Sequence, residues 1–385
     1  MGSMDELINP GVVKQLRAVV ERVDDSRDLD SLRVAEMSVV DKRLRERVNV
    51  VRDALLADLA PDFATTEQVA QALLEQPEFV GWMIWPASEW VTKRALANDS
   101  PADFDAAMAL LARLTTRLSA EFAVRDLLVA RPERGLGIMR TWTDHPDEHV
   151  RRLASEGSRA HLPWGRRVPW LIQHPVATQS IVDGLYRDES EYVRRSVANH
   201  LNDLSRVDPD VVTSAAARWV SEPDVNTTWV VKHGLRTLVK RGDARALHLV
   251  GFSGAELRID RPRVSAKTVP WGGTLTFSTT VSNDGALEAN VAIDYAIGFR
   301  RANGAVRPKT FKIASRRIGP GESVLVEKAH SFRPITTRAY YPGPHFVTVQ
   351  ANGLLSAPEG FQLETADSGV PQDLKRNVAE GESDD

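Results

Sequence analysis

Apolar positions recur every three to four residues from residue 10 to residue 250, which predicts a long succession of amphipathic helices. The first of them shows the pattern in Val12, Val13, Leu16, Val19, Val20 and Val23. Prolines punctuate the segment, and several stand where a new helix would begin, a position that proline favours. These prolines are Pro61, Pro77, Pro101, Pro132, Pro146, Pro163, Pro175, Pro209 and Pro223.

Two stretches of this helical segment resemble each other. Residues 147–154 read Asp-Glu-His-Val-Arg-Arg-Leu-Ala, residues 189–198 read Glu-Ser-Glu-Tyr-Val-Arg-Arg-Ser-Val-Ala, and the shared valines, Val150 and Val193, are 43 positions apart. A third copy without the arginine pair runs over 224–240. A period of about 40–47 residues with two helices per unit is typical of HEAT-like repeats, which stack into a curved solenoid with a concave binding face. A plain helical bundle is the alternative.

The pattern changes after Gly251 to an alternation of apolar and polar residues, which predicts β-strands. The alternating stretches are residues 264–281, 291–299, 310–318, 323–332 and 345–350. Turn signals separate them, among them Asn283-Asp284-Gly285 and Asn303-Gly304. At least six strands at this spacing predict an immunoglobulin-like β-sandwich.

The predicted fold is therefore a HEAT-like α-helical solenoid followed by an immunoglobulin-like β-sandwich. We place the helical domain at 5–254, the sandwich at 257–365 and an acidic, disordered tail at 366–385. Charge divides along the same lines, because residues 256–364 hold 14 Lys and Arg against 9 Asp and Glu, whereas the tail holds 2 against 6. One basic domain is compatible with nucleic-acid binding even though the net charge is −3.

Composition excludes several classes of site. The chain has no cysteine, which excludes disulfides, cysteine-ligated zinc, iron–sulfur clusters and cysteine nucleophiles. It has no apolar run long enough for a membrane span, and its first ten residues are polar and acidic, unlike a signal peptide. We expect a cytoplasmic protein with no membrane partner. No phosphate-binding loop or zinc motif is present, and His145 and His149, with Pro146 between them, are expected to be a solvated helix end.

The segment from Val150 to Trp170 holds the richest candidate chemistry. Arg152, Glu156 and Arg159 are spaced i, i+4 and i+7, which places them on one stripe of a helix. A carboxylate between two arginines stays ionised at neutral pH. The alternative is a surface salt-bridge ladder with little energetic value.

The following repeat adds a further carboxylate, and the helical region is rich in tryptophan. Asp203 lies late in its predicted helix, where a carboxylate opposes the helix dipole, so either a functional role or a local pair with Arg206 is needed to explain it. Most tryptophans are expected in the core. Trp164 and Trp229 are the two that we place at a ligand, since an exposed indole stacks on a base and attracts a cation.

The two repeated motifs resemble those of a known family. Residues 150–159 (Val-Arg-Arg-Leu-Ala-Ser-Glu-Gly-Ser-Arg) with Leu162-Pro163-Trp164, and residues 193–203 (Val-Arg-Arg-Ser-Val-Ala-Asn-His-Leu-Asn-Asp), are similar to the AlkC branch of the HEAT-like-repeat DNA glycosylases, which also include AlkD. The resemblance covers most of residues 5–250, and some members of the branch carry an Ig-like C-terminal domain. It implies hydrolysis of the N-glycosidic bond of cationic alkylated bases, chiefly 3-methyladenine, with 3-methylcytosine as a second candidate.

The resemblance also implies roles for individual residues. Glu156 and Asp203 match active-site carboxylates, and Glu121 lies one repeat earlier, where AlkD has its catalytic aspartate. Arg152 matches the arginine that contacts the DNA backbone near the lesion. Asn199 stands where AlkD-type chains have a tryptophan, so the aromatic cradle for the lesion is expected to be built differently, from Trp164. The expected lesion-binding residues are Trp164, Trp229 and Asn199, and the expected DNA-binding residues of the helical domain are Arg152, Ser158, Arg159, Arg195 and His200.

This chemistry needs few components. A 3-methylated adenine already carries positive charge, so it leaves without a general acid, and nearby carboxylates stabilise the oxocarbenium-like transition state and orient water. We therefore expect no metal and no cofactor, and a monomer that acts on double-stranded DNA with alkylated bases and is nucleoid-associated when bound. The open alternatives are a non-catalytic DNA-damage binder and a protein-interaction scaffold.

The basic β-sandwich is expected to be a DNA clamp. Arg300 and Arg301 precede the Asn303-Gly304 turn and Lys309 follows it, so these three are expected to contact DNA phosphates. Strand-edge charge that prevents aggregation is the alternative.

Overall fold

The computed structural model of the protein describes residues 4–252, 256–335 and 338–365. The chain divides into two compact units, Met1–Leu235 and Arg236–Asp385. The first is helical and the second contains the β-strands, as the sequence pattern predicts. The predicted acidic tail lies outside the described residues. Within the described ranges, no helix is both long and apolar enough to cross a membrane.

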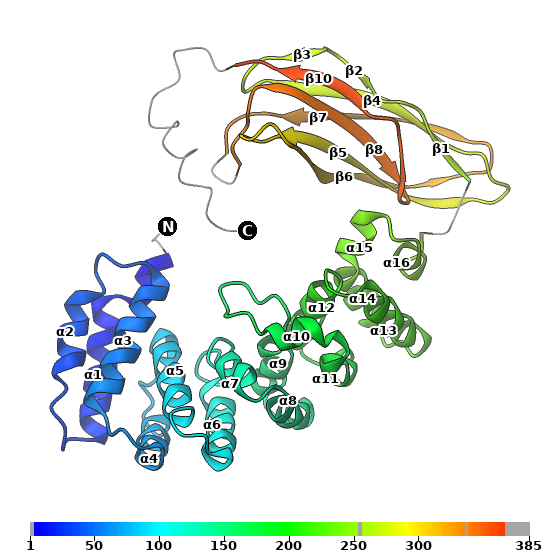
Figure 1. The fold of residues 1–385 in the computed structure, drawn as a ribbon. Helices are drawn as coiled ribbons and strands as arrows, with labels where there is room; N and C mark the ends of the chain where they lie inside the picture. The colour runs from blue at the N-terminus through cyan, green and yellow to red at the C-terminus, as the bar shows by residue number, and fades with distance from the viewer. Residues whose placement is uncertain (1–3, 253–255, 336–337, 366–385) are drawn as a thin grey trace. The chain divides into compact units, whose positions relative to one another are not determined.

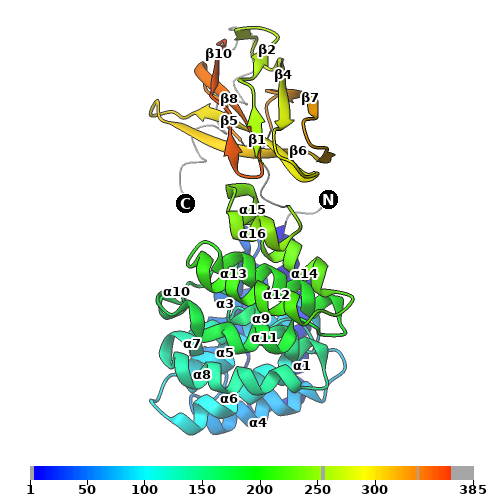
Figure 2. The ribbon, with the colours of Figure 1, turned by 90° about the vertical axis from the view of Figure 1, so that its right-hand side faces the viewer.

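The helices of the first unit lie side by side in a curved row from α1 to α14 (Figure 1), and Figure 2 looks along that row. They are α1 Pro10–Val23, α2 Asp30–Ser38, α3 Leu44–Asp58, α4 Phe63–Leu74, α5 Ile84–Ala95, α6 Pro101–Leu114, α7 Val124–Ala130, α8 Pro132–Thr141, α9 Glu148–Gly157, α10 Pro169–Gln173, α11 Gln179–Leu185, α12 Glu191–Leu204, α13 Pro209–Ser221 and α14 Thr227–Gly234. Short 3₁₀ helices cover Met4–Ile8, Gly81–Met83, Trp142–Asp144 and Pro175–Thr178.

Local sequence determines where these helices begin. Pro101, Pro132 and Pro209 each occupy the first turn of a helix, which confirms the prediction from proline placement. Asp147 caps α9 by accepting a hydrogen bond from the backbone N–H of His149 at 2.8 Å. The cap orients the helix that carries the Arg152–Arg159 stripe.

The two similar motifs occupy equivalent helices of successive repeats. Helix α9 carries the first and α12 the second; α12 packs against α9 on one side and α14 on the other. The valines that the motifs share, Val150 and Val193, are both buried. Each helix thus buries its apolar face only against its neighbours, which is the packing expected of a HEAT-like solenoid.

The second unit contains two helices, α15 Arg236–Arg241 and α16 Ala244–Leu249, together with the β-sandwich. These helices pack on the sandwich although the sequence pattern changes only after Gly251. Gly242 leaves no room for a side chain against the backbone of Gly353, and the Gln350 amide donates to the Lys240 carbonyl at 3.3 Å. Close backbone approach of this kind needs glycine.

The sandwich consists of two sheets within the described residues. Its strands are β1 Leu257–Ile259, β2 Arg263–Val264, β3 Thr268–Val269, β4 Thr274–Asn283, β5 Ala289–Arg300, β6 Val306–Ile318, β7 Ser323–Ser331, β8 Gly343–Ala351, β9 Leu354–Leu355 and β10 Glu359–Leu363. One sheet joins β1, β2 and β7 to the central β4, and the other has the order β3-β10-β8-β5-β6 with β9 beside β8. The predicted stretch 264–281 is three strands rather than one, because Pro270 and the turn at Gly272, whose φ is 74°, interrupt it.

The interior of the sandwich is aromatic and contains buried histidines. His330 is 7% exposed, and its Nδ1 lies 2.9 Å from the Tyr295 hydroxyl. Burial, with a smaller contribution from Arg338, lowers the pKa of His330 from 6.5 to about 4. His345 is also buried, and burial lowers its pKa as well.

Acid is therefore expected to destabilise the second unit. The unfolded chain binds the His330 proton more tightly than the folded chain, so this contribution to stability is fully present above pH 6.5 and is lost as the pH falls toward 4, by about 3 kcal/mol. Denaturant unfolding of the full chain across this pH range measures the loss. His330→Gln should reduce the loss of stability between pH 6.5 and pH 4 by about that amount. An unchanged slope would contradict the assignment.

Candidate active site

A pocket of about 250 Å³ opens on the first unit between α5, the turn before α7 and the loop after α9. Its lining residues are Trp82, Trp85, Leu118, Ser119, Glu121, Phe122, Glu156, Arg159, Leu162, Pro163 and Trp164. Trp85 stacks on Phe122 with ring centroids 4.2 Å apart, and Trp82 lies beside Trp85 at 6.4 Å. The pocket thus brings an aromatic wall and carboxylates together.

The carboxylates belong to a ladder of alternating charges that crosses three repeats. Glu121 pairs with Arg152, whose other nitrogen lies 3.5 Å from Glu156. Glu156 pairs in turn with Arg159, and the Nε of Arg159 donates to Asp203 at 2.7 Å. The three side chains predicted to form one helical stripe do meet, although α9 ends at Gly157 and Arg159 reaches Glu156 from the segment after the helix. The ladder thus alternates three carboxylates with two guanidiniums.

The ladder is buried, so it is not the surface ladder considered as an alternative. Glu156 is 6%, Arg159 7% and Asp203 4% exposed. Burial raises the pKa of Asp203, and Arg159 opposes that rise. Burial alone would lower the pKa of Arg152, but Glu121 and Glu156 raise it above its ordinary value.

Serine hydroxyl groups donate hydrogen bonds to two of these carboxylates. The Ser196 hydroxyl, on α12, donates to Glu156 Oε2 at 2.6 Å, and the Ser119 hydroxyl donates to Glu121 Oε2 at 2.7 Å. Arg152 donates to the same Ser119 oxygen at 2.8 Å. Each carboxylate is therefore held in one orientation by partners from a neighbouring repeat, which is the preorganisation that electrostatic catalysis requires.

The loop after α9 is anchored by a buried arginine that sequence reasoning missed. Arg125, on α7, is fully buried and donates to the carbonyls of Gly157 at 3.0 Å, Arg159 at 2.7 Å and Arg166. Burial lowers the pKa of Arg125 to about 10. In the anchored loop, Trp164 has φ of 60°, an unusual value for a bulky residue, and its side chain is 63% exposed. Such strain often marks a functional position.

The structure brings together only some of the predicted site residues. Glu121, Glu156 and Trp164 share the pocket, and Arg159 links it to Asp203. Trp229 and Asn199 lie elsewhere on the row: Trp229 stacks on His233 at 5.1 Å, and the His233 ring lies 3.2 Å from the Asn199 amide oxygen. These two are therefore not in the pocket wall. Asp203 pairs with Arg159 and forms no ion pair with Arg206 among the described residues.

Two predicted DNA contacts lie in the interior. Ser158 and His200 are both 0% exposed. The Ser158 hydroxyl donates to the Ala154 carbonyl at 2.6 Å, and His200 Nε2 lies 3.0 Å from the Thr178 hydroxyl. Both side chains pack between helices rather than on a surface that DNA could touch. Arg195, by contrast, is exposed and pairs with Glu191 one turn earlier.

Sequence reasoning also missed the aromatic wall. Trp82 and Trp85 were expected in the core, and Trp85 is indeed 2% exposed, yet both line the pocket. Phe122 follows Glu121 directly in the chain, which was the available signal. Within the described ranges, no cluster of three or more His, Asp or Glu side chains is arranged to hold a metal ion.

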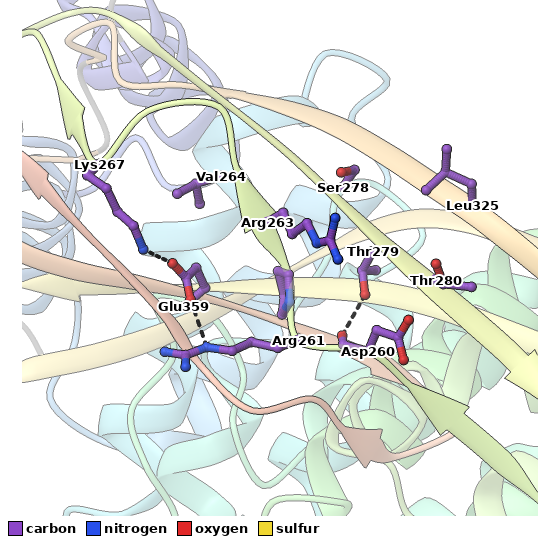
Figure 3. A pocket seen from close by; sticks show the side chains of 11 residues that line it. Asp260, Arg261, Arg263, Val264, Lys267, Ser278, Thr279, Thr280, Leu325 and Glu359 are labelled. Atoms are coloured by element: carbon purple, nitrogen blue, oxygen red, sulfur yellow. Dashed lines mark hydrogen bonds and ion pairs between the residues drawn. The ribbon is translucent and has the colours of Figure 1, made fainter.

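Figure 3 shows a second pocket, of about 670 Å³, on the β-sandwich beside β2. Its acids are Glu359, which pairs with Arg261 at 2.7 Å and with Lys267, and Asp260, which pairs with Arg258. Arg263 and hydroxyl-bearing residues also line it. The pocket lacks the aromatic wall of the first, so the pocket on the helical unit is the candidate active site.

The predicted DNA-contacting residues of the sandwich lie around the β5–β6 hairpin. Arg301 and Lys309 are exposed, and Arg300 donates to the Pro342 carbonyl at 2.6 Å. Arg338 lies over the rings of Phe299, Phe311 and Tyr340, 4.6 Å from the Phe299 centroid. None of these four cations forms an ion pair within the described part of the chain.

Comparison with known proteins agrees with both units. A family described as DNA alkylation repair enzyme matches residues 42–238, and a second, the C-terminal Ig-like domain of the uncharacterised protein YhaZ, matches residues 258–365. The uncharacterized protein YhaZ of Bacillus subtilis strain 168 is 32% identical over 368 residues, covering 94% of this chain and 100% of the relative.

A solved structure resembles the chain over the same length. It is the alkylpurine DNA glycosylase AlkC of Pseudomonas fluorescens, bound to DNA that contains an abasic site analog. The TM-score is 0.80 at 32% sequence identity, and the match covers 94% of this chain and 100% of the other. Both family matches and the 32% identity over nearly the full length agree. The chain therefore belongs to the DNA alkylation repair enzyme family, in its AlkC-like branch with a C-terminal Ig-like domain.

Proposed function

We propose that this protein is a monofunctional DNA glycosylase that removes cationic alkylated bases, chiefly 3-methyladenine, with 3-methylcytosine as a second substrate. The observation that carries the proposal is the pocket in which Glu121 and Glu156 face an aromatic wall. The similarity of the whole chain to an AlkC enzyme that was solved bound to DNA supports the same conclusion. The partner is double-stranded DNA that contains alkylated bases.

The charge of the ladder suits this reaction. A cationic base leaves as a neutral molecule, so the chain needs no proton donor, and the developing charge lies on the deoxyribose. Glu121 and Glu156, two fixed carboxylates of the ladder that line the pocket, stabilise that oxocarbenium-like state in surroundings of low polarity. The side chain of Glu121 is the most exposed of the three carboxylates, and Glu121 is our candidate for orienting water.

The aromatic wall suits the base. Trp164 presents an exposed indole at the pocket mouth, while Phe122 and Trp82 line its interior. Aromatic faces attract a cationic base and stack on it whatever its edge pattern. Tyr192 does not line the pocket, but the Arg152 guanidinium lies over its ring, 5.1 Å from the centroid.

Release of free base is the decisive measurement. Wild-type protein with a duplex carrying one 3-methyladenine should release the free base and leave an abasic site, and EDTA should not slow it. A damage binder would bind this duplex without releasing base. A protein-interaction scaffold would prefer neither methylated nor unmodified DNA to a neutral competitor. Either result would reject the proposal.

The β5–β6 hairpin is expected to strengthen DNA binding. Reversing the charge of Arg300, Arg301 and Lys309 to glutamate should weaken binding at least about tenfold and make the salt dependence shallower by roughly three counterions, because each cation that meets a phosphate releases one. Fluorescence anisotropy at several salt concentrations measures both quantities.

Exposed cations away from the hairpin turn supply a matched control for this variant. Reversing Arg263, Arg317 and Arg333, which form no ion pair within the described residues, changes the charge of the same unit equally. Equal losses of affinity in both triple variants would show a general charge effect and would contradict a clamp at the hairpin.

A further inference from the structure

Glu89 is a buried carboxylate that takes no part in the ladder. It lies on α5, one turn after Trp85, and is 3% exposed. The Trp85 indole N–H donates to Glu89 Oε1 at 2.8 Å. Arg45, on α3, donates to both carboxylate oxygens at 2.5 and 3.2 Å, and Arg52 donates to Oε2 at 3.3 Å.

This arrangement is more than core packing requires. Burying a carboxylate is costly unless it is paired and fully hydrogen-bonded, and an apolar residue would fill the same volume without that cost. Here two arginines of α3 hold the carboxylate, and the carboxylate in turn holds a single outward group, the indole N–H of Trp85. The one hydrogen bond fixes the rotation of the indole about its Cβ–Cγ bond.

The position of that indole matters for the pocket. Trp85 lines the pocket and stacks on Phe122 at an interplanar angle of 22°. Phe122 also lines the pocket, and it directly follows the candidate catalytic residue Glu121 in the chain. A chain of contacts therefore runs from Arg45 and Arg52 through Glu89 to the wall on which a base would rest.

We propose that Glu89 is a positioning residue that determines which bases the pocket accepts. Glu89 fixes the orientation of the Trp85 indole, and through the Trp85–Phe122 stack it fixes the width of the pocket. The inference rests on the proposed glycosylase function for its substrate, but the fixed orientation of Trp85 is a property of the free protein. Arg45 and Arg52 in turn hold the Glu89 carboxylate in place.

Two variants test this arrangement from both ends. Glu89→Gln keeps the shape of the side chain and one acceptor oxygen but loses the charge that holds the arginines. Trp85→Phe keeps an aromatic ring, smaller than the indole, but loses the N–H donor. Each should raise KM for a 3-methyladenine duplex about tenfold and change kcat less than about threefold, because the pocket is loosened while the ladder is intact. The preference for 3-methyladenine over 3-methylcytosine should fall by a similar factor in each, and the double variant should do no more than either alone.

The control is another paired glutamate away from the pocket. Glu36 accepts from Arg17 at 2.6 Å between α2 and α1, so Glu36→Gln removes an ion pair without touching the wall. It should leave KM and base preference unchanged. A Glu89→Gln variant with wild-type KM and preference, or fully additive effects with Trp85→Phe, would overturn the inference.

A readout that does not need catalysis separates this inference from the proposed function. In the NMR spectrum of the full chain, the Trp85 indole proton should exchange at least about tenfold faster in Glu89→Gln than in wild type, while the indole protons of the buried Trp90 and Trp219 stay protected. Absence of base release by the wild type would reject the glycosylase alone. Unchanged exchange at Trp85 would reject the positioning role alone.

Discussion

Glu156→Gln is expected to slow single-turnover excision of 3-methyladenine by roughly 30- to 1000-fold, which corresponds to about 2–4 kcal/mol in the barrier. Glu156 lines the pocket at the centre of the ladder, where Arg152, Arg159 and Ser196 fix its orientation. The amide keeps the shape but removes the charge that stabilises the transition state. Asp203→Asn should have an effect in the same range, because Asp203 sets the position of Arg159.

Binding and chemistry should separate in this experiment. Affinity for DNA with an abasic site should change little, since the product carries no oxocarbenium charge. Asp188→Asn is a matched control: Asp188 pairs with Arg151 at 2.7 Å, is as buried as the ladder and does not line the pocket. If the control slows excision as much as Glu156→Gln does, the loss is structural and the catalytic assignment fails.

The parts of the site that could be predicted are those that local geometry fixes. Arg152 and Glu156 lie one turn apart on α9, so their spacing alone places them together, and Arg159, two residues after the end of α9, still reaches Glu156. The repeat period likewise brings Asp203 to the same level one helix later, although its partner, Arg159 rather than Arg206, depends on how α9 and α12 pack.

The parts that could not be predicted depend on packing between distant segments. Trp85 meets Phe122 only because α5 lies beside the turn before α7, and nothing in either local sequence indicates that pair. Ser158 and His200 stand in motifs rich in polar residues, but their side chains turn inward, where Ser158 donates to the Ala154 carbonyl and the His200 ring meets the Thr178 hydroxyl. Polar residues in a motif can serve packing between repeats as well as a ligand.

Arg159→Met is expected to reduce the free energy of unfolding of the first unit by about 3–5 kcal/mol at pH 8, the cost of leaving a buried carboxylate without its partner. Asp203 forms no other ion pair in the described part of the structure. Burial already raises the pKa of Asp203, and without Arg159 the pKa rises further. A carboxyl group with a raised folded-state pKa is neutral in mild acid, so the loss should be small near pH 4 and should grow as the pH rises through that pKa.

A second substitution distinguishes charge from packing. Asp203→Asn in the Arg159→Met background should restore most of the stability lost at pH 8 and remove its pH dependence, because the uncompensated charge is gone. Arg151→Met, at the equally buried pair with Asp188, should destabilise the chain without the same rescue by Asp203→Asn. Chemical denaturation of the wild type and of these single and double variants at pH 5 and pH 8 measures each quantity. If the double variant stays as unstable as Arg159→Met at both pH values, the methylene stem of Arg159, and not the pairing of its guanidinium with Asp203, holds α9 and α12 together.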